Sequence, residues 1–406
     1  MIDSCDVLII GGGLVGASLA IALDDVGLSV ALAEAVPPRV DLQPSHDERN
    51  LALARATVNA LEALGVWDHV AARATPIRRI HVSRHGEFGA ARLSAATHGL
   101  DAFGAVLPAR ELGNGLLARL DACRQLVRIA PAQLTAVAGS ESAVDATLKS
   151  ADGERIVRAR LLVGADGTAS FVRSAAGIGT EETDYAQTAF VTTVLPQRDP
   201  DGCAFERFTA SGPVAVLPLA ERRAGVVLTV PSADAARVAG LDDAGFLDLL
   251  HQRFGYRLGA LSRPGRRVSY PLRRVQAMRT IAARIALVGN AAQTLHPIGA
   301  QGFNLGLRDA LTLAELLIDA AQRGADPGAP ELLTRHADMR REDRDGTAAT
   351  SDGLARWSAD ESPPLKLLRS LGLIALDRIG PLQAAVVRRG MGFRGIIPRL
   401  ALGRQP

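Results

Sequence analysis

The chain has 406 residues, of which 48% are hydrophobic and 22% are charged, which is typical of a globular protein with two to three domains and excludes disorder over most of its length. The formal net charge is only +3, yet residues 363–406 carry one lysine and seven arginines against a single acid. Cys5, Cys123 and Cys203 are odd in number and far apart, which argues against a disulfide framework and favours a reducing compartment.

The N-terminus does not have the pattern of a signal peptide, because no basic segment precedes its first short apolar run. No stretch approaches the roughly 20 consecutive apolar residues that span a bilayer. We therefore expect a cytoplasmic protein that is at most peripheral on the inner face of the cytoplasmic membrane.

Apolar runs and helical spacing predict the elements in chain order. Residues 6–10 are expected to form a buried strand, 14–26 a helix and 28–34 a second strand, which together make a βαβ unit. Residues 35–48 are rich in Pro, Asp and Gln and predict a loop. Further helices are expected at 51–72, 109–122, 242–254, 303–323 and 331–357, a hairpin turn at 151–154, and buried strands at 160–163 and 285–288.

These elements predict an α/β fold in which distant segments build one nucleotide-binding domain. Each of the three buried strands, at 6–10, 160–163 and 285–288, is followed by a glycine turn. Residues 77–105 and 185–275 instead show short alternating runs, typical of antiparallel sheet. We therefore expect a discontinuous Rossmann-like domain over 1–72, 106–180 and 276–350, an inserted, mostly antiparallel β-sheet domain over 73–105 and 181–275, and a basic, apolar helical region over 351–406.

Gly11, Gly13 and Gly16 form a G-x-G-x-x-G pattern between the first strand and the first helix. Glycines in this pattern allow a tight turn, close approach of backbone amides to a pyrophosphate, and close packing of helix on strand. Glu34 ends the second strand, 21 residues after Gly13, where a carboxylate can accept both ribose hydroxyls. Together the glycines and the acid indicate a dinucleotide site.

Two further motifs follow the other buried strands. Asp166-Gly167 alone is a common turn. The segment 288–306, Val-Gly-Asn-Ala-Ala-Gln-Thr-Leu-His-Pro-Ile-Gly-Ala-Gln-Gly-Phe-Asn-Leu-Gly, combines a strand end, a proline-rigidified loop and two glycines at a helix start. Exposed amides at a helix start favour an anion or an electron-rich ring edge.

The three motifs together resemble the fingerprints of class A flavoprotein monooxygenases, the group typified by para-hydroxybenzoate hydroxylase. The third motif reads Gly289-Asn290 here, which is similar to the ubiquinone-biosynthesis branch and, within it, to the 2-octaprenyl-6-methoxyphenol hydroxylases. Residues 204–209 (Ala-Phe-Glu-Arg-Phe-Thr), Gly212-Pro213 and 64–67 (Leu-Gly-Val-Trp) carry the narrower resemblance. One departure is Gly299-Ala300, where that branch usually has Ala-Gly.

The resemblance implies a glutathione-reductase-type domain that binds FAD non-covalently. Arg49 would meet the pyrophosphate or ribitol side and Arg110 would lie beside the cofactor. The remaining cofactor residues would be Asp166, Gly167 and Asn290 at the phosphate–ribitol region, and Gly299, Ala300, Gln301, Gly302, Phe303 and Asn304 at the isoalloxazine ring.

The resemblance also implies the reaction. A transiently bound NAD(P)H would reduce the flavin, O₂ would add as a C4a-hydroperoxide, and one oxygen would pass to the ring of a polyprenylated phenol. Other ubiquinone-biosynthesis enzymes are expected partners, whereas a nucleic acid and a metal are not. His296 and Pro297 are the candidates for a catalytic role, since a histidine can deprotonate a phenol, but the pair also suits a purely loop-shaping role.

Two alternatives remain open from the sequence. A soluble aromatic-acid hydroxylase of the same fold would need a buried arginine for the substrate carboxylate, for which Arg207 or Arg222 are the candidates. A non-enzymatic prenyl-binding protein, similar to the GDP-dissociation inhibitors, would lack an intact flavin loop. The C-terminal region is expected either to lie on a membrane or to pack as a helix on the FAD domain.

Overall fold

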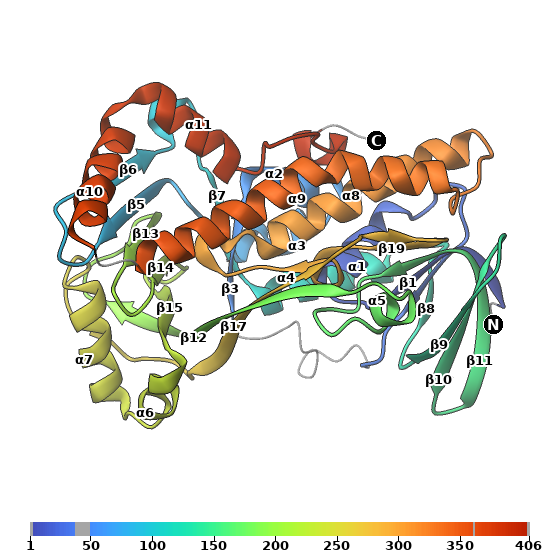
Figure 1. The fold of residues 1–406 in the computed structure, drawn as a ribbon, viewed down its shortest axis with the longest axis horizontal. Coiled ribbons are helices and arrows are strands. Elements are labelled where there is room, and N and C mark those ends of the chain that lie inside the picture. Colours follow the sequence, from blue (N-terminus) through green and yellow to red (C-terminus); the bar gives the residue numbers. More distant parts are fainter. Residues whose placement is uncertain (1–2, 37–48, 360–361, 404–406) are drawn as a thin grey trace.

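The computed structural model describes residues 3–36, 49–359 and 362–403, so most of the loop expected at 35–48 lies outside the described residues. Two large sheets lie side by side, and long helices cover them (Figure 1). Helices α8 (Gln301–Gln322) and α9 (Pro330–Ala359) run along the molecule together. The fold is α/β, as the sequence predicts.

The first sheet brings together the three buried strands that precede the glycine turns. β1 (Ser4–Ile10) pairs in parallel with β11 (Gly153–Gly164), and β11 pairs in parallel with β19 (Ile285–Leu287). The remaining strands of this sheet are β2 (Val30–Ala33), β8 (Val127–Ile129), β9 (Gln133–Gly139), β10 (Val144–Ser150) and β18 (Ile281–Ala282). The expected turn at 151–154 joins β10 to β11. All three glycine turns therefore lie at one edge of the sheet.

Two helices pack on this sheet from one side. α1 (Leu14–Ala22) and α8 are buried along most of their length and share an aliphatic core with β1 and β11. α4 (Ala109–Asp121) packs beside α1. The core holds few aromatic side chains, in line with a composition of only 4% aromatic residues.

The second sheet has nine strands and is mostly antiparallel. Its main path is β20 (Gln293–Thr294), β17 (Val268–Ala277), β12 (Thr180–Pro196), β15 (Ala224–Pro231), β14 (Val214–Pro218), β13 (Cys203–Phe208), β5 (Arg79–Arg84) and β6 (Ala90–Ser94), with β16 (Leu261–Ser262) paired to β12. α6 (Ala235–Ala239) and α7 (Asp243–Phe254) cover one face of this sheet.

The helix expected over 51–72 is wrong at its start. Residues Asn50–Ala54 form strand β3, which pairs with β7 (Gly104–Pro108), and β7 pairs with β4 (Thr75–Pro76) in a small third sheet. Leu-Ala-Leu-Ala suits a strand as well as a helix, and the distant partner β7 decides between them. The helical part is divided into α2 (Arg55–Ala63), α3 (Trp67–Val70) and a short 3₁₀ turn.

The C-terminal region continues from α9 into α10 (Pro363–Arg378) and α11 (Gly380–Gly390). α10 packs against β6 of the second sheet, and Val387 of α11 joins a core cluster there. Within the described residues, no single helix has the length and apolar character needed to cross a bilayer. Only α10 and α11 together meet that criterion, and the chain bends by 93° between them.

Candidate functional site

The glycine turn after β1 is held tightly by its neighbours. Gly11 has φ +104°, and a Cβ there would lie 2.5 Å from the backbone oxygen of Ala165. A Cβ on Gly16 would lie 1.9 Å from the oxygen of Gly11, so only glycine lets α1 approach the strand end. Gly13 precedes α1, and no side chain caps this helix N-terminus. Its backbone N–H groups therefore remain available to an anion.

Glu34 at the end of β2 faces this turn. The amide of Gly12 donates to Glu34 Oε2 at 2.6 Å, and the amide of Val36 donates to Oε1 at 2.9 Å. Each carboxylate oxygen can accept more than one hydrogen bond, so these bonds orient the side chain and leave capacity for hydroxyl donors. The expected acid therefore lies beside the expected glycine turn.

The second and third motifs lie next to the first. The Cα of Asp166 is 2.9 Å from the position of a Cβ on Gly11. The Asp166 carboxylate accepts from Ser170 Oγ at 2.5 Å and from the amide of Val172 at 3.0 Å, so it holds the start of the short helix α5 (Phe171–Ala175), whose N-cap is Ser170. Gly167 has φ +84°.

The buried guanidinium of Arg173 joins the turns after β11 and β19. It donates to the oxygen of Thr168 at 2.8 Å and to that of Ala291 at 2.9 Å. The neighbouring Asn290 is exposed. This arginine was not expected from the sequence, because nothing near 173 indicates contact with residue 291.

Arg49 and Arg110 lie together through the pairing of β3 with β7. The amide of Ala109 donates to the oxygen of Arg49 at 2.8 Å, which places Arg110 one residue further along α4. Both side chains are exposed. The Arg49 guanidinium lies 5.6 Å from the ring centroid of Tyr270 on β17, within the range of a cation–π contact. Arg49 therefore bridges from β3 to the nine-stranded sheet.

The loop before α8 forms an open cradle. Gly299 has φ +71° and Ala300 has φ +51°, and no side chain caps the N-terminus of α8. A Cβ on Gly299 or Gly302 would meet no described atom within 4 Å. Gln301 donates back to the oxygen of Gly299 at 3.0 Å, and Phe303 packs on the main core. Open space over glycines and free helix amides fit a planar ligand edge.

The Asn304 side chain ties this loop to strand β3. Its Nδ2 donates to the oxygens of Ala52 and Ala300 at 2.9 and 2.8 Å. Its Oδ1 accepts from the amide of Ala54 at 2.9 Å and from Thr57 Oγ1 at 2.7 Å. The side-chain amide is thus fully used inside the protein, so it holds the loop on β3 and does not reach toward a ligand.

His296 is buried and fully bonded. Its Nδ1 accepts from the amide of Ile298, and Nε2 lies 3.2 Å from Gln187 Oε1, so the neutral tautomer carries its proton on Nε2. Burial lowers its pKa to about 4. The adjacent Pro297 is exposed. This geometry favours a loop-shaping role for His296 over that of a proton acceptor.

Two neighbours of His296 escaped the sequence analysis. The ring of Tyr185 on β12 contacts the imidazole edge-on, with centroids 4.8 Å apart, and its hydroxyl donates to Asp352 of α9 at 3.1 Å. Burial and Asp352 raise the pKa of Tyr185 to about 12. A β-bulge between Asp184 and Gln187 sets the direction in which the Tyr185 side chain points. The bulge leaves no clear signal in the sequence.

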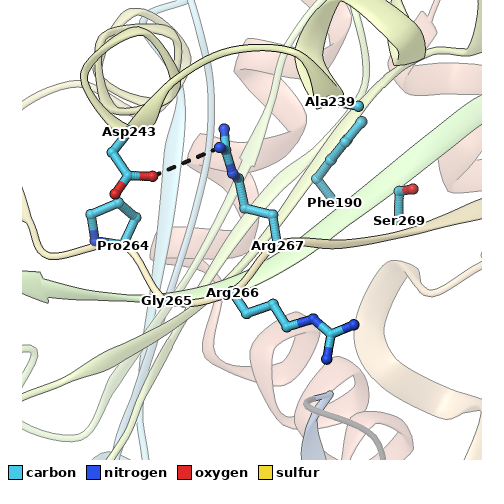
Figure 2. Close-up of a pocket in the computed structure, with 8 residues that line it drawn as sticks. All are labelled: Phe190, Ala239, Asp243, Pro264, Gly265, Arg266, Arg267 and Ser269. Atoms are coloured by element: carbon cyan, nitrogen blue, oxygen red, sulfur yellow. Dashed lines mark ion pairs between the residues drawn. The ribbon is translucent and has the colours of Figure 1, made fainter.

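A surface hollow of about 440 Å³ lies elsewhere, between α6, α7 and the segment that leads into β17 (Figure 2). Phe190 lines it, and Arg267 points across it toward Asp243 at 3.7 Å, while Arg266 points away. Phe190 belongs to the core under α7, so the hollow lies on the face of the sheet turned away from β3. It is not part of the glycine-lined site.

The assembled site joins three glycine turns, an acid on β2 and an open loop at the start of α8. These features define a dinucleotide-binding flavoprotein with an inserted sheet. A family model described as "FAD binding domain" matches residues 4–342, and the chain belongs to this family of FAD-dependent monooxygenases.

Named relatives match almost the full length of the chain. The chain is 39% identical to the ubiquinone hydroxylase UbiL of Rhodospirillum rubrum over 99% of this chain and 91% of that protein. It is 33% identical to the 3-demethoxyubiquinol 3-hydroxylase of Escherichia coli, over 96% and 98%. It is 30% identical to the human ubiquinone biosynthesis monooxygenase COQ6, over 94% and 91%.

Solved structures agree on the fold. The p-nitrophenol 4-monooxygenase PnpA from Pseudomonas putida superposes with a TM-score of 0.80 at 19% identity, over 97% of this chain and 99% of that one. PqsL from Pseudomonas aeruginosa, described as a probable FAD-dependent monooxygenase, gives 0.76 at 26% identity, over 91% and 99%. The expected family and the cofactor FAD are thereby confirmed.

Proposed function

We propose that this protein hydroxylates the ring of a polyprenylated phenol on the route to ubiquinone, with NAD(P)H as electron donor and O₂ as oxidant. The observation that carries the proposal is its similarity, over nearly the whole chain, to three hydroxylases named for ubiquinone or its precursors. Bound FAD would supply the redox chemistry, namely uptake of hydride from the nicotinamide and transfer of one atom of O₂ to the ring, with the other atom released as water.

We infer which part of FAD each group of residues would bind. The turn Gly11–Gly16 and the start of α1 bind the pyrophosphate, and Glu34 accepts the ribose hydroxyls. Arg49 and Arg110 neutralise phosphate charge from the β3 side. The rest of the cofactor would be held by Asp166, Gly167 and Asn290 and by the cradle of Gly299, Ala300, Gln301, Gly302 and Phe303, which Asn304 supports.

The arrangement of arginines favours a phenol over an aromatic acid. Arg207 lies on the α7 face of the nine-stranded sheet, because it is two residues from Phe205, which packs against Phe254 of α7. Its register partner Ser83 bonds to Arg257. Arg222 is exposed in a turn beside Asp199. Neither candidate for binding a substrate carboxylate is therefore directed toward the flavin loop.

The decisive assay uses purified protein loaded with FAD. NAD(P)H oxidation is followed with a prenylated methoxyphenol and with 4-hydroxybenzoate, and mass spectrometry detects the added oxygen. We expect hydroxylation of the phenol. Hydroxylation of 4-hydroxybenzoate alone would instead support the hypothesis that the protein is an aromatic-acid hydroxylase. If the folded protein binds prenyl phenol but neither retains FAD nor oxidises NAD(P)H, the result would support the hypothesis of a non-enzymatic prenyl-binding protein.

We also propose that α10 and α11 hold the enzyme against an anionic membrane where such a substrate resides. Exposed apolar side chains follow the two helices, and exposed arginines lie among them. An apolar and basic surface gains roughly 1 kcal/mol for each cation near anionic lipid, in addition to apolar burial. The apolar residues are Leu367, Leu368, Leu371, Ile374, Ile379, Leu382 and Val386, and the arginines are Arg378, Arg388 and Arg389.

The membrane proposal is tested by co-sedimentation with vesicles that contain phosphatidylglycerol, at low and high salt. Truncation is unsuitable, because the buried Arg369 of α10 pairs with Glu87 at 2.8 Å. The full chain with Leu367, Leu368 and Leu371 changed to serine keeps this pair. We expect salt-sensitive binding of the wild type and weaker binding of the variant. Equal, negligible binding of both would leave only a packed C-terminal helix.

A further inference from the structure

Strand β13 directs a carboxylate onto the face of the second sheet opposite α7. Phe205 packs against Phe254 of α7, with centroids 5.6 Å apart. Its neighbour Ala204 instead belongs to a separate core cluster with residues of β6 and α11. Because side chains alternate along a strand, Glu206 lies on the face of Ala204. It is therefore directed away from α7.

This face is turned toward the segment that supports the flavin loop. The cluster around Ala204 includes Phe103 and Val106, and Ala52 of β3 packs against it. The oxygen of Ala52 accepts the hydrogen bond from Asn304 that fixes the cradle. β3 thus connects the cradle directly to the face that carries Glu206.

The surroundings of Glu206 are apolar. Its partners in register are Val82 on β5 and Ala215 on β14. Within the described part of the chain, no hydrogen bond or ion pair joins its carboxylate to another residue. Burial alone raises its pKa to about 7, while part of the side chain stays accessible. Neither carboxylate oxygen is fully buried, so a ligand that enters this face can reach the carboxylate and donate a hydrogen bond to it.

The charged groups described near this face do not pair with Glu206. Arg84 lies on the same face at the end of β5 and bonds to Glu87 at 2.8 Å, and Glu87 also holds Arg369 of α10. Arg49, which precedes β3, contacts Tyr270. None of these groups contributes to the pKa shift of Glu206. By comparison, the buried Asp343 between α8 and α9 accepts hydrogen bonds from two arginines.

We propose that Glu206 contacts the aromatic substrate, accepting a hydrogen bond from its ring hydroxyl and repelling any ring that carries a carboxylate. The inference rests on the proposed function, and it explains the choice of substrate by charge. A phenol has a pKa of about 10 and is a neutral donor at physiological pH, whereas a benzoate is an anion. A like charge brought near a poorly hydrated carboxylate is strongly disfavoured.

The test is Glu206→Gln in the full-length, FAD-loaded protein, with Glu182→Gln as the control. Glu182 is an exposed residue of β12 in the same sheet, so it receives the same chemical change away from this face. Titration calorimetry measures binding of two probes, a prenylated methoxyphenol and 4-hydroxybenzoate, at about pH 6 and about pH 8, on either side of the raised pKa. Calorimetry needs no turnover.

In the wild type, the phenol should bind more tightly at the higher pH and 4-hydroxybenzoate more weakly, because the ionised Glu206 is the stronger hydrogen-bond acceptor and only the ionised form repels the acid. Glu206→Gln should abolish both pH trends, weaken phenol binding by roughly 10-fold and tighten 4-hydroxybenzoate binding by at least about 10-fold at the higher pH. Glu182→Gln should match the wild type.

Two outcomes overturn the inference: pH trends that persist in Glu206→Gln, or unchanged selectivity between the two probes. A variant that loses its fold is recognised by circular dichroism, and Glu206→Asp, which keeps the charge, then replaces it and must keep the wild-type selectivity. The proposed function fails differently. A wild type that discriminates between the probes as expected, yet hydroxylates neither, would refute the proposed function while the role of Glu206 in binding stands.

Discussion

A substitution at Gly302 allows the effect on folding to be measured separately from the effect on cofactor binding. No described atom lies within 4 Å of a Cβ at this position, the second residue of α8, and its φ is not in the left-handed region. Replacing Gly302 by valine therefore causes no clash within the protein. Removing a helical glycine gains up to about 1 kcal/mol, and β-branching returns a few tenths of that. Stability without FAD should change by less than about 1 kcal/mol.

The same substitution should impair the FAD site, because its two methyl groups occupy the open space over the cradle. We expect at least about 10-fold weaker FAD binding, equivalent to about 1.4 kcal/mol, and loss of hydroxylation. Urea unfolding of the apoprotein, FAD titration and the phenol assay measure the three quantities. Gly353→Val is the control, since Gly353 of α9 also has open space around a Cβ. Normal FAD affinity and turnover in Gly302→Val would refute our placement of the ring.

Three other substitutions test the remaining parts of the site. Gly13→Glu should fold but purify without flavin, because an anion at the start of α1 occupies the pyrophosphate position; full flavin content would contradict this. Asn304→Ala should destabilise the protein by about 2–4 kcal/mol in urea unfolding, because buried partners lose their bonds; a change near zero would exclude the bracing role. His296→Gln concerns pH. The pKa of His296 is about 4 when folded and 6.5 when unfolded, so the unfolded chain binds more protons between these values. Wild-type stability should therefore rise with pH across this window, by at most about 1.4 kcal/mol per pH unit from this residue, and hold above it. The variant should show a shallower rise, and an identical profile would show that His296 is not buried in neutral form.

The cofactor half of the molecule is largely predictable from sequence, because its constraints are local in the chain. Gly11 needs a positive φ and Gly16 needs to lack a side chain, and both requirements appear as glycines at fixed spacing after a buried strand. The same logic located the turns after β11 and β19. Where local signals are ambiguous, as in β3, the prediction failed because the pairing partner lies about 50 residues away.

The roles of Asn304 and His296 were not predictable for a different reason. Both lie inside a motif that indicates a flavin loop, and a motif does not reveal which side chains face the ligand and which face the protein. Asn304 bonds to Ala52 and Thr57, some 250 residues away in sequence. His296 bonds to Gln187 of β12, which lies 109 residues earlier in the chain. Only tertiary structure distinguishes such supporting residues from residues that contact a ligand.

The charge that the second sheet presents on each face depends on strand register and is not encoded in a sequence motif. Glu206 and Arg207 are adjacent in sequence, so alternation places them on opposite faces of β13, and exchanging the two would present a cation where the structure presents an acid. The cofactor cradle is fixed separately, through β3 and the start of α8. Because the two halves use different elements, a change of one residue on the sheet can alter the charge of the accepted ring without disturbing FAD.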